Sequence, residues 1–298
     1  MGRLQIPAMF CLILVLSVSA LASASLKVGF YRSKCPSAEA IGCDGSVLLK
    51  STPGIPSERE HPANNPSLRG FEVIDEAKAQ IEAVCHKTVS CADILAFAAR
   101  DSANKLGGIN YAVPAGRRDG RVSIMVEVEQ NLPPPSFNAK ELASNFARKG
   151  MSVDEMVTLS GAHSIGVSHC SSFSTRLYSF NATHAQDPSM DPRYAAFLKT
   201  KCPPPSNGAG RDPTVVLDAL TPNRLDNKYY VEVRNHRGVL TSDQTLLSSH
   251  STRGIVLNNA KHGSTWAAKF AKAMVHMGYL DVLTGSQGEI RRQCSVVN

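Results

Sequence analysis

The cysteines constrain this chain more than any other feature of its 298-residue sequence. Cysteine occurs eight times, at positions 11, 35, 43, 85, 91, 170, 202 and 294. Residues 1–24 are typical of a secretory signal, with Arg3 at the positive end, a short apolar run over 9–18 and an Ala-Ser-Ala cleavage site over 22–24. Cleavage would remove Cys11 and leave seven cysteines in an oxidising compartment. This arrangement predicts a disulfide framework with one odd thiol.

Composition and spacing argue against several classes of protein. The apolar run is too short to cross a bilayer and no later segment is longer, so we expect no membrane span. No cysteine pair has C-x-x-C spacing, which argues against a zinc site. Without Arg3 the formal charge falls by one from +7. A basic secreted protein is drawn to polyanions such as anionic cell-wall polysaccharide, although solubility explains the charge equally well. The basic residues are scattered and only one Trp is present, so we expect no binding to nucleic acid.

Hydrophobic periodicity and capping signals predict a mostly helical chain with long loops, either one large domain or two fused ones over residues 25–298. The expected helices cover 72–85, 94–103 behind a cap at Ser90, 138–149, 156–159 behind a cap at Ser152, and 264–276. The apolar stripe of the last helix, which includes Trp266, is interpreted as core packing. Residues 122–128 give the best strand signal. Proline-rich segments at 133–135 and 202–210 mark loops, and Asn181 is an N-glycosylation acceptor whose occupancy stays open.

The stretch "MVTLSGAHSIGVSHC", residues 156–170, is the most informative part of the sequence. A capped helix leads into Ser160, Gly161 and Ala162, whose small side chains let a bulky flat group approach the backbone. His163 follows. Taken alone, a histidine near a helix end is usually a partner of the helix dipole or of a hydrogen bond.

In its wider context this stretch resembles the proximal haem-ligand signature of the secreted plant (class III) haem peroxidases. The resemblance continues, in the order typical of that family, through "FYRSKCPSAE", "GCDGSVLL", "NNPSLRGFEVID", "VSCADILAFAARD", "GRRDGRVS", "NLPPP", "LDALTPNRLDNKYY", "LTSDQTL" and "FAKAMVHMG". It implies an all-α haem peroxidase fold over residues 25–298, with haem b between distal and proximal helical halves. It also implies an extracellular cell-wall enzyme that oxidises phenolic donors with hydrogen peroxide.

The resemblance assigns roles to residues on the proximal side. His163 matches the axial ligand of the haem iron, next to Ser164, and Asp243 matches the carboxylate that accepts the other ring proton. Without the family, Asp243 would be interpreted as a solvated loop acid, and Asp218 and Asp226 as turn or cap residues. The proximal calcium ligands are implied to be Ser164, Asp218, Thr221, the carbonyl of Arg224 and Asp226, which are oxygen donors suited to a hard cation.

The same resemblance implies the disulfides and a donor contact. Pro133 matches a position near bound aromatic donors. The implied pairs are Cys35–Cys85, Cys91–Cys294 and Cys170–Cys202. Cys43 is then unpaired, and we expect it to cause disulfide-linked dimers or aggregation.

The distal side lacks a segment that the family has. About thirty residues, more than two average helices, are expected between Ile41 and Gly42. They would carry the distal arginine, the distal histidine, an aspartate ligand of calcium and the partner of Cys43. The residual distal calcium ligands are the Gly42 carbonyl, Asp44, Ser46 and nearby Glu58. Asn64 matches the residue that orients the distal histidine, and His61 is interpreted as an exposed loop histidine rather than a substitute.

Three hypotheses account for a resemblance with such a gap. The first is a haem peroxidase whose gap comes from a mispredicted exon or a splice form. The second is a family member that binds haem but is catalytically impaired because the distal His/Arg helix is absent. The third is a non-enzymatic, glycosylated wall protein without haem. The motifs on both sides of the gap are intact, and a loss in one block favours the first hypothesis, because drifting pseudoenzymes tend to lose single residues.

Overall fold

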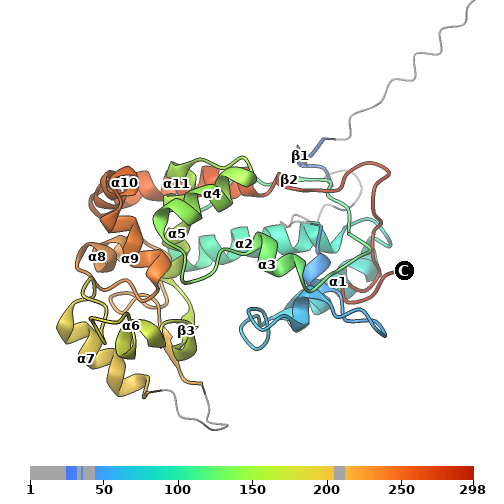
Figure 1. Cartoon of the computed structure of the whole chain (residues 1–298). Coiled ribbons are helices and arrows are strands. Elements are labelled where there is room, and N and C mark those ends of the chain that lie inside the picture. Colours follow the sequence, from blue (N-terminus) through green and yellow to red (C-terminus); the bar gives the residue numbers. More distant parts are fainter. Residues whose placement is uncertain (1–24, 32–34, 36–43, 205–211) are drawn as a thin grey trace, which may run out of the picture.

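The computed structural model in Figure 1 describes residues 25–31, 35, 44–204 and 212–298. The predicted signal over 1–24 and the residues Gly42 and Cys43 lie outside the described residues. Within the described part, no helix has the length and hydropathy needed to cross a membrane.

Helices are the main secondary structure of the described chain, as expected for an all-α fold. The predicted helices appear as α1 (Phe71–Val84), α2 (Cys91–Gly107), α4 (Ala139–Arg148), α5 (Val153–Ser160) and α11 (Gly263–Met277). The others are α3 (Glu127–Asn131), α6 (Ser174–Tyr178), α7 (Pro192–Lys201), α8 (Lys228–Arg234), α9 (Thr241–Ser248) and α10 (His250–Lys261). In Figure 1, α2 runs across the centre of the molecule, with α1 toward one end and α8 to α10 toward the other.

Side-chain caps set the starts of three of the predicted helices, α2, α4 and α5. The Ser90 hydroxyl accepts the Asp93 N–H at the start of α2. The buried carboxylate of Asp119 accepts the N–H groups of the first two residues of the same helix, at 3.1 and 2.8 Å. Helices α4 and α5 begin with complete capping boxes at Asn138 and Ser152. The caps at Ser90, Asn138 and Ser152 are local in sequence, which is why the sequence predicts these helices, whereas the contact of Asp119 with α2 depends on the fold.

The strand expected over 122–128 is wrong. Residues 122–124 are irregular, 125–126 form a turn, and α3 begins at Glu127. The segment lies beside the loop at 56–58, where the Met125 N–H donates to the Pro56 carbonyl, and no strand pairs with it within the described residues. The strands that do form are short antiparallel pairs: β1 (Lys27–Val28) with β2 (Pro114–Ala115), and β3 (Val167–His169) with β4 (Thr214–Val216).

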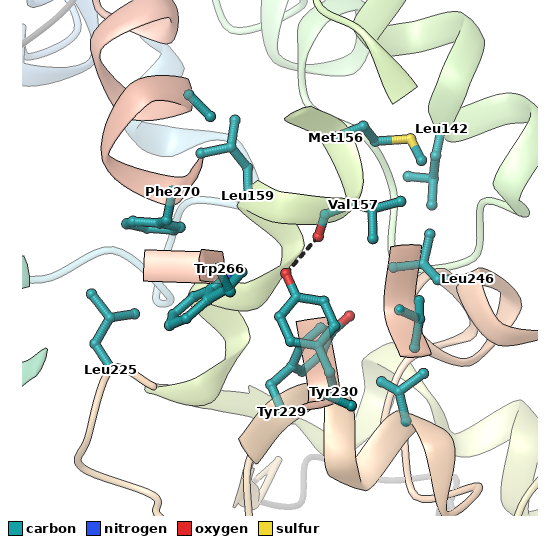
Figure 2. Close-up of a cluster of buried hydrophobic side chains, with 14 of the residues drawn as sticks. Leu142, Met156, Val157, Leu159, Leu225, Tyr229, Tyr230, Leu246, Trp266 and Phe270 are labelled. Carbon is teal, nitrogen blue, oxygen red and sulfur yellow. Dashed lines mark hydrogen bonds between the residues drawn. The ribbon is translucent and has the colours of Figure 1, made fainter. Parts of the chain in front are cut away.

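The largest core surrounds α5 and is shown in Figure 2. Trp266 and Phe270 of α11 lie on one side of α5, and Tyr229 and Tyr230 of α8 lie below it. Trp266, Phe270 and Ala273 are buried, so this part of the apolar stripe of α11 is core packing as expected. Met277 at the end of the stripe is 37% exposed, so for this residue the expectation is wrong. This core is continued by the buried residues Ala103, Ile109, Leu142, Met151, Met156, Val157, Leu159, Leu225, Val233, Leu246, Leu247, Val256, Ala260 and Ala273.

Three disulfides connect distant parts of the chain, and they are the pairs that the resemblance implies. Cys91–Cys294 joins the start of α2 to the C-terminal segment across a sequence separation of 203 residues. Cys35–Cys85 and Cys170–Cys202 close loops of 50 and 32 residues. All six cysteines are buried.

Candidate active site

A cavity of about 750 Å³ lies beside His163, which is within the usual size range of small-molecule sites. Its walls come from the loop at 62–67, the proline-rich loop at 132–135, the ends of α4 and α5, strand β3 and the start of α9. The apolar wall residues include Leu132, Pro133, Pro135, Leu142, Phe146, Leu159, Leu217, Leu240 and Met277. Pro133, the expected donor contact, thus lies on the wall of the cavity that His163 faces.

His163 and Asp243 form the central pair of this cavity. His163 Nδ1 lies 2.7 Å from Asp243 Oδ1, although the two residues are 80 positions apart. The His163 side chain is 37% exposed and that of Asp243 only 2%. The Tyr229 hydroxyl donates to the same Asp243 oxygen at 3.0 Å, and the Leu240 N–H donates to the other oxygen at 3.0 Å. Asp243 is therefore a buried carboxylate with three partners, not a solvated loop acid.

The pKa shifts of this pair have opposite directions. Burial alone would lower the pKa of His163, but the negative charge and the hydrogen bond of Asp243 outweigh it, so the pKa is raised above 6.5. Burial tends to raise the pKa of Asp243, but His163, Leu240 and Tyr229 lower it below its ordinary value. Burial also keeps the pKa of Tyr229 well above its ordinary value, so Tyr229 stays a donor. The imidazole Nδ1 is thus held as a donor, which leaves Nε2 free for a ligand.

Close packing at the end of α5 positions His163. The Tyr230 hydroxyl donates to the carbonyls of Val157 and Thr158 at 2.7 and 2.9 Å (Figure 2 shows the first of these bonds), and the Trp266 indole N–H donates to Thr158 at 3.1 Å. A Cβ at Gly161 would lie 2.6 Å from the Tyr230 oxygen and 2.7 Å from the Trp266 nitrogen. Only glycine fits there, and the chain then turns into the short 3-10 helix that carries His163.

The predicted proximal calcium ligands lie together behind His163. Thr221 Oγ1 lies 3.3 Å from Asp218 Oδ2 and 3.1 Å from Asp226 Oδ1, and the Ser164 hydroxyl accepts the Asp226 N–H at 3.1 Å. Asp218 and Ser164 are completely buried. Burial and the neighbouring Asp226 charge raise the pKa of Asp218, a cost that a bound cation would offset. The Arg224 side chain points outward, and its Nε lies 3.7 Å from Asp226.

Within the described part of the chain, no three or more His, Cys, Asp or Glu side chains gather in a way that fits a metal ion. The predicted proximal set has only two carboxylates and depends on hydroxyl and carbonyl oxygens, which suits calcium rather than zinc or a transition metal.

The remaining distal residues line a second cavity of about 570 Å³. Asp44, Ser46 and Glu58 meet there, and the Ser46 N–H donates to Asp44 Oδ1 at 3.1 Å. Burial raises the pKa of Glu58, and the charges of Asp44 and Glu127 raise it further. Asn64 also lines this cavity and donates its amide to the Glu58 carbonyl at 2.7 Å. Glu127, at the start of α3, is a member of this acidic group that the sequence did not single out.

His61 is less exposed than expected. Its side chain is 15% exposed, its Nδ1 accepts the Ala63 N–H, and its Nε2 lies 3.6 Å from Glu129. The neighbouring Pro62 and Ala63 line the cavity beside His163, but His61 does not. His61 is thus a loop histidine paired with an acid, turned away from that cavity.

Asn181 lies in an exposed turn, where its side-chain oxygen accepts the N–H groups of Thr183 and His184 and the Thr183 hydroxyl. This position is open to an oligosaccharide.

A helical fold with a buried carboxylate behind a cavity histidine matches the proximal arrangement that the resemblance to haem peroxidases implies. Comparison with known proteins makes this specific: a family model described as "Peroxidase" matches residues 23–262, so the chain belongs to the peroxidase family. The members of this family are oxidoreductases that use haem and calcium, and they oxidise phenolic donors with hydrogen peroxide. The plant class III members are secreted.

Relatives of known name cover most of this chain. It is 52% identical to Peroxidase 5 of Vitis vinifera, over 92% of each chain. It is 45% identical to Peroxidase 2 of Zea mays, over 92% of this chain and 89% of the relative. It is 41% identical to Peroxidase 57 of Arabidopsis thaliana, over 96% of this chain and 97% of the relative.

The lengths of these alignments contain a second observation. The grapevine alignment runs over 305 positions, yet it uses only 92% of the 298 residues of this chain. The Arabidopsis alignment runs over 317 positions and uses 96%. In each case about thirty alignment positions have no residue of this chain.

Proposed function

We propose that the cavity beside His163 holds haem b and that His163 Nε2 is the axial ligand of its iron. The observation that carries this proposal is the 2.7 Å contact between His163 Nδ1 and the buried Asp243 carboxylate. A carboxylate behind a ligating imidazole fixes its tautomer and makes it a stronger electron donor. The apolar walls and the small residues before His163 leave space for a flat, mostly apolar group. Bound haem would supply the iron that reacts with peroxide and takes electrons one at a time from the donor.

The residues of this chain then have separate tasks. Asp243 holds the Nδ1 proton and stays ionised, because its pKa is lowered by His163 and by two further hydrogen bonds. Tyr229 keeps its own proton and fixes the carboxylate oxygen that faces the imidazole. Gly161, Tyr230 and Trp266 fix the backbone that carries the ligand. The apolar wall that includes Pro133 excludes water and leaves an approach for an aromatic donor.

We further propose that this chain activates peroxide slowly, because the segment with the distal histidine and arginine is absent between Ile41 and Gly42. The surplus of about thirty positions in the relatives supports a gap of this length, more than two average helices. General acid–base catalysis contributes about 10²–10⁴-fold. A positioned charge donor contributes roughly 10²–10³ more, and the two are not additive. Among the described residues that line the cavity beside His163, no other group is suited to this role, since the remaining titratable side chains, His169 and Asp212, pair with each other.

The proposed calcium site on the proximal side consists of Ser164, Asp218, Thr221, the Arg224 carbonyl and Asp226. The contacts through Thr221 support it, because they hold both carboxylates within reach of one cation. On the distal side, Asp44, Ser46 and Glu58 are the remaining described ligands of a second, incomplete site.

We also propose that residues 1–24 are a signal that is removed, that residues 25–298 form one peroxidase domain, and that Asn181 carries a glycan. The placement of Asn181 in an exposed turn supports the last point. The formal charge of +7 supports attraction to anionic wall polysaccharide.

Haem binding can be tested through the single tryptophan of the chain. We expect that haem added to the full chain gives a Soret band and quenches Trp266 fluorescence. In His163→Ala, the shift of the Soret band that comes from coordination of the iron by His163 should be lost. His169→Ala, a second histidine on the same cavity, is the control and should leave the band unchanged. An identical spectrum for the wild type and His163→Ala would refute the ligand assignment.

The peroxide reaction is tested separately, by stopped-flow mixing of the haem-loaded chain with peroxide. We expect a rate at least 10²-fold below that of a relative of full length. A full-speed reaction would refute the argument from the distal gap. Sequencing of transcripts across the codons for Ile41 and Gly42 then decides whether the gap is a mispredicted exon, a splice form or a true loss.

A further inference from the structure

We propose that Arg176 is a positioning residue for the His163–Asp243 pair. This inference rests on the proposed role of His163 and assigns a part to a residue outside the cavity. Arg176 belongs to α6, is 1% exposed, and does not contact His163 or Asp243 directly.

Arg176 fixes the loop that leads into α9. Its Nη1 donates to the carbonyls of Gly238, Val239 and Leu240 at 2.6, 2.6 and 3.0 Å. Its Nε donates to Asp187 Oδ2 at 2.8 Å, and Asp187 is itself 3% exposed. One guanidinium thus ties three successive carbonyls to a buried carboxylate on another loop. The planar fork of arginine can do this from two of its nitrogens at once, whereas a lysine ammonium has only three donors at one point and cannot reproduce all four bonds.

This loop in turn sets the position of Asp243. The Leu240 N–H donates to Asp243 Oδ2 at 3.0 Å, and the Asp243 N–H donates back to the Leu240 carbonyl at 3.2 Å. A Cβ at Gly238 would come within 3.1 Å of the Asp243 Cβ, so the loop packs closely on the first turn of α9. Gln244 adds a second tie, because its side chain accepts the Gly238 N–H at 3.0 Å.

A chain of polar contacts therefore runs from Asp187 through Arg176 and the Leu240 peptide to Asp243 and His163. If Arg176 is lost, the three carbonyls lose their common donor and the loop is free to shift. Asp243 would then lose its fixed distance from the imidazole, although its carboxylate is unchanged. Loss of Arg176 should therefore weaken the His163–Asp243 contact in the same direction as Asp243→Asn, but to a smaller extent.

The test compares Arg176→Met and Arg176→Lys with a matched control, Lys78→Met. Lys78 is also 1% exposed, and its ammonium group also joins a carboxylate to a backbone carbonyl. It donates to the Glu82 carboxylate and, at 2.6 Å, to the Val89 carbonyl. Lys78 belongs to α1, which lies at the other end of the molecule from α8 and α9 (Figure 1). Both methionine variants remove a buried cation, so both should lower the midpoint of thermal unfolding. Only the Arg176 variants should weaken the hydrogen bond between the His163 imidazole and Asp243.

Two readouts report on the imidazole. The first is the iron–imidazole stretching frequency of the ferrous haem-loaded protein. In Arg176→Met this frequency should move toward the value of Asp243→Asn, and in Arg176→Lys it should move part of the way. In Lys78→Met it should stay at the wild-type value. In the full chain without haem, the NMR signal of the His163 Nδ1 proton, assigned by its loss in His163→Ala, should broaden or vanish in the Arg176 variants only.

The outcomes separate this inference from the proposed function. If His163→Ala leaves the haem spectrum unchanged, the ligand assignment fails, and the Nδ1 signal of the haem-free chain still tests the contact. If both readouts in Arg176→Met and Arg176→Lys match the wild type while unfolding is destabilised as in Lys78→Met, Arg176 is only structural and the inference is overturned. Should Arg176→Met fail to fold, Arg176→Lys gives the same two outcomes.

Discussion

The substitution Asp243→Asn removes a single charge at the centre of the site and keeps the shape of the side chain. The carboxylate accepts bonds from His163, Tyr229 and Leu240 on its two oxygens. An amide has one acceptor oxygen, so one buried donor meets an NH₂ group and is left unpaired, at a cost of about 1–3 kcal/mol. The remaining bonds lose their charge assistance. The expected total is a destabilisation of about 2–4 kcal/mol, because relief from burying a charge offsets part of the loss.

This destabilisation should depend on pH in a defined direction. The folded pKa of His163 is raised above 6.5, so its contribution is complete below the unfolded pKa and is lost as the pH rises through the folded value. The folded pKa of Asp243 is lowered below 3.8, so its contribution is present above the unfolded pKa and is lost as the pH falls through the folded value. The difference between wild type and Asp243→Asn should therefore be largest between about pH 4 and 6.5.

Urea unfolding of the haem-free full chain at a series of pH values measures this difference. Asp212→Asn is the matched control, because Asp212 also faces a histidine, His169, but at 3.6 Å and with a side chain that is 39% exposed. A partly exposed pair of this kind contributes about 0–1 kcal/mol, so its variant should follow the wild type closely. A difference for Asp243→Asn that is flat across this pH range, or no larger than that of Asp212→Asn, would refute the assignment of a coupled buried pair.

Three further substitutions test other parts of the structure. Gly161→Ala forces a Cβ to within 2.7 Å of the Trp266 nitrogen, so we expect the free energy of unfolding to fall by about 1–3 kcal/mol and the Trp266 fluorescence to change. Gly254→Ala is the control, because no atom lies within 4 Å of its Cβ, and it should leave the stability unchanged or increase it. Asp218→Asn should abolish the fall in unfolding temperature that a calcium chelator causes in the wild type, a shift worth about 2.7 kcal/mol at a calcium concentration 100 times Kd. An equal response of both proteins to chelator would exclude Asp218 as a ligand. Replacement of both Cys91 and Cys294 by alanine should lower the free energy of unfolding, measured in urea, by roughly 2–5 kcal/mol. A smaller decrease would mean that the Cys91–Cys294 disulfide constrains the unfolded chain only weakly.

The sequence predicted the parts of this fold that depend on local signals. The starts of α2, α4 and α5 follow from Ser90, Asn138 and Ser152, because a cap acts within three residues of its own position. The strand prediction at 122–128 failed for the opposite reason. Alternating apolar residues describe a strand only if another strand supplies its hydrogen bonds, and that information lies elsewhere in the chain.

The candidate site was predictable only through the family resemblance. Nothing near Asp243 in the sequence points to His163, which is 80 residues away. Tyr229 was missed as a partner of Asp243, although "NKYY" was among the quoted motifs, because a buried tyrosine usually signals packing alone. Glu127 and Arg176 were missed because each acts through a neighbour that the fold brings to it. The contacts in three dimensions, rather than the motif, identify them.

The placement of these contacts leads to a last prediction. Every side-chain hydrogen-bond partner that the described chain supplies to His163 and Asp243 lies between residues 163 and 243, far in sequence from the proposed gap after Ile41. The proximal half should therefore be complete without the distal segment. If the proposed gap between Ile41 and Gly42 is filled with the segment that the family resemblance implies there, the rate of the peroxide reaction should rise by at least 10²-fold.

The same insertion should leave the iron–imidazole stretching frequency unchanged, because it adds no partner to His163 or Asp243. The control is the same insertion with the implied distal histidine replaced by alanine, since it restores the volume of the segment but not the proposed base. If the complete insertion gave no faster reaction than the control while the haem band was present in both, the slow peroxide step would have a cause other than the missing base. If instead the stretching frequency moved with the insertion, the two halves would be coupled, and the independence of the His163–Asp243 pair would be wrong.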